Sequence, residues 1–276
     1  MPYEPYVRLA CFLAALLLLT AWEVRAPRRE LTVRKPGRWT SNLGLAAVNV
    51  LAVRLALALG AVGVALAADE RQWGLFNNLP LPFWLEVLLA AIALDFVIYL
   101  QHVAFHAVPA LWRLHMVHHA DPDFDLTTGL RFHTLEALLS LGIKAAAILL
   151  LGAPALGVLI FEVLLNATSM FNHANARLPT GLDRALRLLV VTPDMHRVHH
   201  SVHARETNSN FGFNLPWWDY LLGTYRAQPR DGHEGMTIGL SHLRGEGLTR
   251  LPRMLALPFV EKAGGYPMLR RPRNLD

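Results

Sequence analysis

The chain has 276 residues, of which 53% are hydrophobic, and its mean hydropathy is +0.30. That value is high for a soluble protein of this length and predicts an integral membrane protein. The formal net charge of +5 does not indicate a nucleic-acid partner, because much of the positive charge lies in short loops beside apolar runs, where it sets membrane orientation. The single cysteine, Cys11, excludes an intrachain disulfide and any cysteine-based zinc or iron–sulfur site.

Three apolar runs come first along the chain. Residues 9–22 resemble the core of a signal peptide, but Glu4 weakens the basic start and no small-residue cleavage site follows, so we expect a retained helix. Runs at 43–68 and 82–101 are each long enough to cross a hydrocarbon core of about 30 Å. The first loop, 23–38, is rich in Arg and Lys, whereas the second loop has Arg71 alone. By the positive-inside rule, the third helix ends at the cytoplasmic face.

The fourth apolar region, 137–167, is expected to form a hairpin or re-entrant pair broken at the sequence GAP, 152–154. A single crossing would separate the later histidines from the earlier ones. The predicted fold is therefore all-α: a membrane bundle of about three full spans plus this pair, with a cytoplasmic, histidine-rich helical cap.

The expected divisions of the chain are 1–82 for the N-terminal helices and loops, 83–226 for the catalytic domain, and 227–276 for a polar, lightly structured tail. Three tryptophans are expected to anchor the membrane interface: Trp112, Trp217 and Trp218.

Histidines gather in three short motifs, HVAFH at 102–106, HMVHH at 115–119 and HRVHH at 196–200. Positions i, i+3 and i+4 of a helix share a face, so each motif can present its imidazoles together. The candidate metal ligands are His102, His106, His115, His118, His119, His196, His199 and His200. Eight imidazoles exceed what one ion accepts, which predicts two metals, with His173 as a ninth ligand.

Four further residues are candidates for supporting roles. His133 and His203 could ligate, bond to a ligand or handle a proton. Asp95 follows the helical spacing of the first motif, and an intramembrane acid is usually functional, so we expect it to orient a ligand imidazole. Glu136 could do similar work or simply begin a helix.

A single histidine is readily explained as a surface or core residue satisfied by a hydrogen bond. Three histidine motifs on one predicted membrane face are not explained in this way. A metallohydrolase is disfavoured because no His-Glu-x-x-His signature occurs. A metal-binding or transport protein without redox chemistry remains an alternative, although carriers need polar residues along a path, and here they cluster at one face.

The three motifs, together with NFGFNLPWWDYLLGTY at 210–225 and RWTSNLG at 38–44, resemble the fatty acid hydroxylase or sterol desaturase superfamily. The resemblance covers about 83–226 and implies a four-helix membrane bundle, a cytoplasmic cap and a di-metal centre held by the nine histidines above. It implies that the metal is iron and that the protein uses O₂ to hydroxylate or desaturate a lipid. Val103, Asp121 and Thr134 depart from the common pattern, but no motif histidine is lost.

Imidazoles suit such chemistry because they bind first-row metals and resist oxidation better than thiolates. Zinc remains possible on affinity alone. The sequence contains no dinucleotide fingerprint, haem motif or cysteine cluster, so we expect an external electron donor, such as a ferredoxin or cytochrome with its reductase. We expect the protein in a bacterial inner membrane, with the histidines on the cytoplasmic face.

Overall fold

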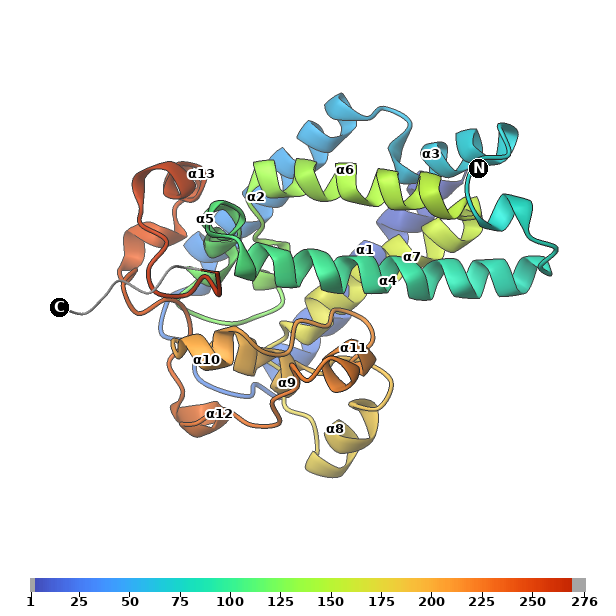
Figure 1. Cartoon of the computed structure of the whole chain (residues 1–276). Coiled ribbons are helices and arrows are strands. Elements are labelled where there is room, and N and C mark those ends of the chain that lie inside the picture. Colours follow the sequence, from blue (N-terminus) through green and yellow to red (C-terminus); the bar gives the residue numbers. More distant parts are fainter. Residues whose placement is uncertain (1–2, 270–276) are drawn as a thin grey trace.

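The computed structural model describes residues 3–269, and across them the chain forms helices joined by loops, with isolated β-bridges and no sheet (Figure 1). The α-helices are α1 (Glu4–Arg25), α2 (Lys35–Ala56), α3 (Gly60–Glu70), α4 (Phe83–Ala107), α5 (Pro109–His119), α6 (Thr134–Leu151), α7 (Ala155–Asn172), α8 (Thr180–Leu186), α9 (Pro193–His199), α10 (Ala204–Thr207), α11 (Trp217–Leu221), α12 (Gly232–Gly235) and α13 (Leu251–Val260). Three short 3₁₀ helices are η1 (Phe76–Asn78), η2 (Thr128–Leu130) and η3 (Glu246–Thr249).

Among residues 3–269, five segments are long and apolar enough to cross a membrane: α1, the α2–α3 pair, α4, α6 and α7. Large apolar side chains on them point outward, and Leu17, Leu55 and Leu150 are among the most exposed large hydrophobic residues. Such a surface suits a lipid environment, because apolar side chains that contact acyl chains do not have to be buried within the protein. The predicted integral membrane bundle is confirmed.

The predicted break in the fourth apolar region is also confirmed, and it separates α6 from α7. Gly152 ends α6 with φ of +63°, a left-handed conformation that favours glycine, and Pro154 directly precedes α7. The chain therefore reverses, so that residues before α6 and residues after α7 lie at the same end of the bundle.

The second apolar run differs from the expected single helix. It begins earlier, at Lys35, where Pro36 fits the first helical turn, and it is interrupted after Ala56. Gly60 has φ of +62° and starts α3 in a new direction. The left-handed residue breaks the helix there, although the hydropathy of the run is continuous.

A buried charge cluster ties three of the membrane helices together. In α7, the Glu162 carboxylate accepts hydrogen bonds from Arg8 of α1 at 2.6 Å and from Lys144 of α6 at 2.7 Å. Paired charges of this kind hold helices in register where hydrophobic contact alone gives little preference.

Residues 227–269, the described part of the predicted tail, are packed against the rest of the protein rather than lightly structured, and residues 270–276 lie outside the described residues. Met254 and Leu257 of α13 are fully buried in a cluster with Leu45 and Met116, and the indole of Trp112 donates to the Ala263 carbonyl at 2.8 Å. Trp112 is therefore a core residue and not an interfacial anchor. Hydrophobic residues spaced through this arginine- and proline-rich segment supply the contacts that its composition conceals.

Candidate metal centre

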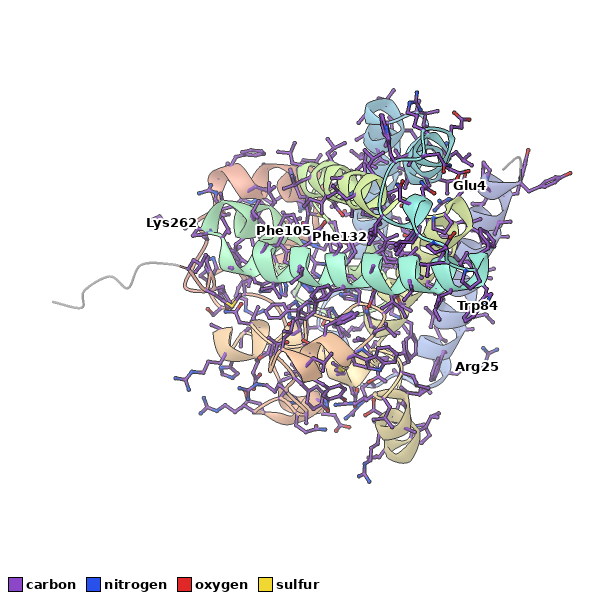
Figure 2. The ribbon with its side chains drawn as sticks, turned by 45° about the vertical axis from the view of Figure 1, so that its right-hand side comes forward. Glu4, Arg25, Trp84, Phe105, Phe132 and Lys262 are labelled. Carbon is purple, nitrogen blue, oxygen red and sulfur yellow. The ribbon has the colours of Figure 1, made fainter. Side chains whose placement is uncertain are left out.

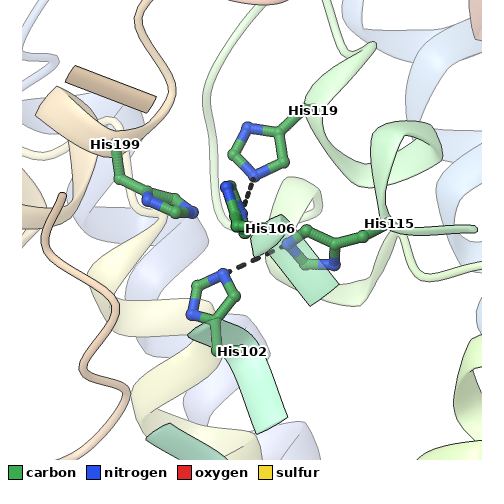
Figure 3. Close-up of side chains that lie close together, drawn as sticks. All are labelled: His102, His106, His115, His119 and His199. Carbon is green, nitrogen blue, oxygen red and sulfur yellow. Dashed lines mark hydrogen bonds between the residues drawn. The ribbon is translucent and has the colours of Figure 1, made fainter. Parts of the chain in front are cut away.

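All nine predicted ligand histidines are buried together at one end of the bundle, and their ligand nitrogens fall into two groups. The five-histidine group consists of His102, His106, His115, His119 and His199 (Figure 3). The four-histidine group consists of His118, His173, His196 and His200. Within each group the candidate ligand atoms all lie within 4.8 Å of one another. Two His clusters of this kind can hold two metal ions, in agreement with the predicted count.

Each His-x-x-His-His motif is divided between the two groups. In α5, His115 and His119 belong to the five-histidine group and His118 to the other. At α9 the division is reversed, because His199 joins the five-histidine group while His196 and His200 join the four-histidine group. Residues four apart differ by only about 40° around a helix, whereas the intervening histidine is turned further away. The two motifs therefore interlock, and the expectation that each presents one common face was too coarse.

The Nε2 atoms of neighbouring imidazoles converge within each group. His102 Nε2 lies 3.1 Å from His115 Nε2, and His119 Nε2 lies 3.2 Å from His106 Nε2. In the other group, His173 Nε2 lies 3.1 Å from His118 Nε2. Neutral imidazoles cannot satisfy several such contacts with their own protons, whereas a cation among the lone pairs would satisfy all of them.

The opposite ring nitrogens of several histidines are fixed by oxygen acceptors. His102 donates from Nδ1 to the Phe211 carbonyl at 2.8 Å, and His173 donates to the Ser169 carbonyl at 2.7 Å. The remaining three contacts are His199 with the Ser209 carbonyl (2.7 Å), His106 with Asn208 Oδ1 (3.0 Å) and His115 with Glu136 Oε1 (2.6 Å). Acceptors of this kind place the proton on Nδ1 and leave Nε2 as the ligand atom.

Burial favours the neutral form of six of these imidazoles. Desolvation, reinforced by neighbouring imidazoles, lowers the pKa well below its ordinary value for His118, His119, His196, His199 and His200. Desolvation also lowers the pKa of His173 to about 3. Because only the deprotonated nitrogen binds a metal, these side chains are ready to act as ligands without losing a proton to water.

Of the candidates for supporting roles, Glu136 contacts a histidine of the centre, whereas His133 and His203 do not. Glu136 accepts from His115, as considered. His133 caps α6 by accepting the Leu135 N–H through Nδ1, and among residues 3–269 it contacts neither histidine group. His203 lies outside both groups, half-exposed, with Asp231 at 2.8 Å.

Asp95 differs from the expectation, because its carboxylate bonds to no imidazole in the described part of the chain. It accepts the N–H groups of Asn214 (3.3 Å) and Leu215 (3.2 Å) and the indole N–H of Trp218 (2.8 Å). Its effect on His102 is therefore indirect: it fixes the loop that carries Phe211, whose carbonyl receives the His102 proton.

A buried clamp that the sequence reasoning missed holds the loop after HMVHH. Arg38 of α2 donates to Asp121 at 2.6 Å, to Asp125, and to Thr128 at 2.8 Å, and its side chain is fully buried. The signals available were the three acids in DPDFD directly after the motif and the arginine that opens RWTSNLG. Neither signal identifies the partner, which lies more than 80 residues away in sequence.

Comparison with known proteins places these motifs in a family. The fatty acid hydroxylase family model matches residues 87–224. The chain is 27% identical to ornithine lipid hydroxylase OlsE of Rhizobium tropici over 273 residues, which cover 96% of this chain and 79% of that protein. It is 27% identical to human alkylglycerol monooxygenase (55% of this chain, 32% of that protein) and 31% identical to human cholesterol 25-hydroxylase (51% and 52%). No solved structure matches the chain.

The chain belongs to the fatty acid hydroxylase family, as the sequence motifs predicted. The sequence predicted a membrane lipid hydroxylase or desaturase, and an enzyme of the lipid hydroxylase family is confirmed. The chain spans most of the length of OlsE but only about a third to a half of the two human relatives.

Proposed function

We propose that this member of the fatty acid hydroxylase family uses O₂ to hydroxylate a membrane lipid at two iron ions, one in each histidine group. The observation that carries the proposal is the pair of buried, interlocked groups of imidazoles. The relative aligned over nearly the whole chain is named for an ornithine lipid, and the others for an alkylglycerol and for cholesterol, so a lipid is the substrate class they favour. Desaturation would begin with the same hydrogen abstraction.

The donor set fits iron and the required chemistry. Bound iron would supply O₂ activation, which acid–base side chains cannot provide for an unactivated C–H bond. The all-imidazole set offers nitrogen ligands that suit iron, zinc and copper alike, and the need for redox chemistry selects iron over zinc. The nine histidines would hold the ions, and the acceptors at Nδ1 would orient the rings.

Aromatic side chains would keep water away from the groups. Phe132 stacks on His118 with ring centroids 4.5 Å apart, and Phe124 lies 5.0 Å from His200. On the other side, Phe213 lies 5.2 Å from His102. An apolar wall of this kind suits a hydrocarbon substrate and limits loss of reactive species to solvent.

The electron donor would be a separate protein, a ferredoxin or a cytochrome with its reductase, acting on the cytoplasmic side. The arginine-rich loop between α1 and α2 lies at the histidine end of the bundle, since Arg28 pairs with Asp194 in α9. The positive-inside rule therefore favours a cytoplasmic histidine end.

Metal analysis of detergent-purified protein tests the proposal, with His118→Ala and His199→Ala variants purified alongside. Two metal equivalents are expected in the parent. Each variant is expected to lose mainly one equivalent, because the two residues belong to different groups. Iron-loaded protein with a reductant and O₂ should then oxidise lipid. A parent without stoichiometric metal would refute the proposed two-iron centre, and metal-dependent ion flux without O₂ consumption would favour the transport alternative.

A further inference from the structure

An exposed apolar surface lies on the cap, outside the five membrane helices. It combines α8 and the residues after it with α11, and we call it the α8–α11 patch: Leu182, Leu188, Leu189, Trp217, Leu221 and Leu222. Leu188 is 65% exposed and Leu221 is 74% exposed. Exposure of this extent on adjacent leucines is unusual for a surface that faces water.

The two parts of the patch form one continuous surface. The Trp217 indole donates to the Leu188 carbonyl at 2.7 Å, and the Tyr220 hydroxyl donates to the Arg187 carbonyl at 3.1 Å. The Val191 N–H donates to the Asn214 carbonyl at 3.0 Å, which joins the segments just before α9 and α11. The patch is therefore held in place as a unit.

Contacts with α4 fix the depth of the patch. Asp95 lies twelve residues from Phe83 and twelve from Ala107, the two ends of α4, or about 18 Å from each. Trp218 bonds to Asp95 and packs on Phe96 with ring centroids 4.7 Å apart. In Figures 1 and 2, α4 runs across the picture and α8 lies below it, between its two ends, whereas Figure 1 shows α12 and α13 beyond the α5 end of that helix.

A hydrocarbon core of about 30 Å fills most of the roughly 37 Å length of α4. Even if all of the excess protrudes at the histidine end, Asp95 remains about 10 Å inside the apolar layer. The segment bonded to Asp95 is therefore also at membrane depth, at the level of the exposed α4 side chains Leu89 and Leu100.

The charges around the patch suit the same surroundings. Nearby acids are not free, because Asp219 is buried against the N–H groups of Phe211 and Gly212, and Asp183 pairs with Arg187. The exposed charges beside the patch are cations, Arg184 and Arg226. Arginines at such a boundary extend toward phosphate while the leucines remain in the acyl region.

We propose that the α8–α11 patch is inserted into the acyl-chain region of the leaflet on the histidine side, so that the cap penetrates the membrane and does not merely lie on it. The same segment continues into Phe211 and Phe213, whose rings lie 5.4 Å and 5.2 Å from His102. On the proposed function, a lipid would therefore meet the metal groups at this edge without leaving the bilayer.

Site-directed spin labelling tests the insertion. In a Cys11→Ala background, single cysteines replace Leu188 and Leu221, and the labelled protein is placed in phosphatidylcholine–phosphatidylglycerol nanodiscs. Power saturation compares collisions with O₂, which concentrates in lipid, and with a water-soluble nickel chelate. Leu88→Cys on the outer surface of α4 is the lipid control, and Arg230→Cys on the cap is the water control.

Labels at positions 188 and 221 are expected to match the label at position 88, with an O₂-to-nickel accessibility ratio several-fold above that at position 230. A ratio equal to that at position 230 would overturn the insertion. Labels shielded from both reagents would also overturn it and would indicate a protein partner or a second copy of the chain. The measurement needs neither metal nor turnover, so it is independent of the proposed function.

Discussion

Removal of the Glu136 side chain should weaken the binding of one metal ion and leave the binding of the other unchanged. Glu136 belongs to the five-histidine site, because its Oε1 accepts a hydrogen bond from His115 Nδ1 at 2.6 Å. Within residues 3–269, no other carboxylate bonds to a histidine of the two groups. The other fixed imidazoles donate to neutral oxygens, such as the Ser169 carbonyl for His173. A carboxylate acceptor orients the ring and raises its basicity, so the five-histidine group should lose affinity and the four-histidine group should not.

The expected loss in affinity is about 10- to 100-fold, or about 1.4–2.7 kcal/mol. Glu136→Gln should lie toward the smaller value, because its amide oxygen still accepts the His115 proton, and Glu136→Ala toward the larger. Chelator competition followed by metal analysis measures both ions, with Glu86→Gln at the opposite end of α4 as the control. Equal loss of both ions, or no loss in Glu136→Ala, would refute this reasoning.

Three further substitutions test the surroundings of the centre. Arg38→Met leaves two buried carboxylates without their cation and should lower stability by about 3–5 kcal/mol, seen as a lower melting temperature in detergent; an unchanged value would count against the clamp. In Gly129→Ala the new Cβ would lie 2.3 Å from the Ser169 carbonyl oxygen, so we expect a loss of about 1–3 kcal/mol, whereas Gly181→Ala meets open space and should melt like the parent. Burial lowers the pKa of His233 from 6.5 to about 4, so the unfolded chain binds this proton first and stability is lost as pH falls between those values. His233→Gln should flatten that part of the melting profile, and an identical profile would contradict the assignment.

The tertiary structure also explains how the membrane bundle and the cap form one unit. Arg38 in α2 and Asp95 in α4 each place an ionisable side chain inside the protein, and each bonds to a segment far away in sequence. Both hold loops that carry or follow predicted ligand histidines. Rigid support of this kind keeps the imidazoles in place in a chain that forms no β-sheet across residues 3–269 and has a single cysteine.

The sequence by itself determined the class of fold and the chemistry of the centre. Long apolar runs predict membrane helices because only a helix satisfies its backbone within lipid, and GAP at 152–154 predicts the reversal because glycine and proline end helices. Three histidine motifs at helical spacing predict metal binding, because single surface or core histidines would not collect so many imidazoles at one membrane face.

Only the tertiary structure decided how those histidines divide between two groups. The division depends on the relative rotation of α5 and α9, which is set by packing between segments about 80 residues apart and leaves no local signal. The same holds for the partner of Asp95: its helical spacing places it on the histidine face, but its carboxylate bonds to the segment 214–218, which leads into α11. Local spacing fixes which residues can share a face, and long-range packing selects the atoms that they meet.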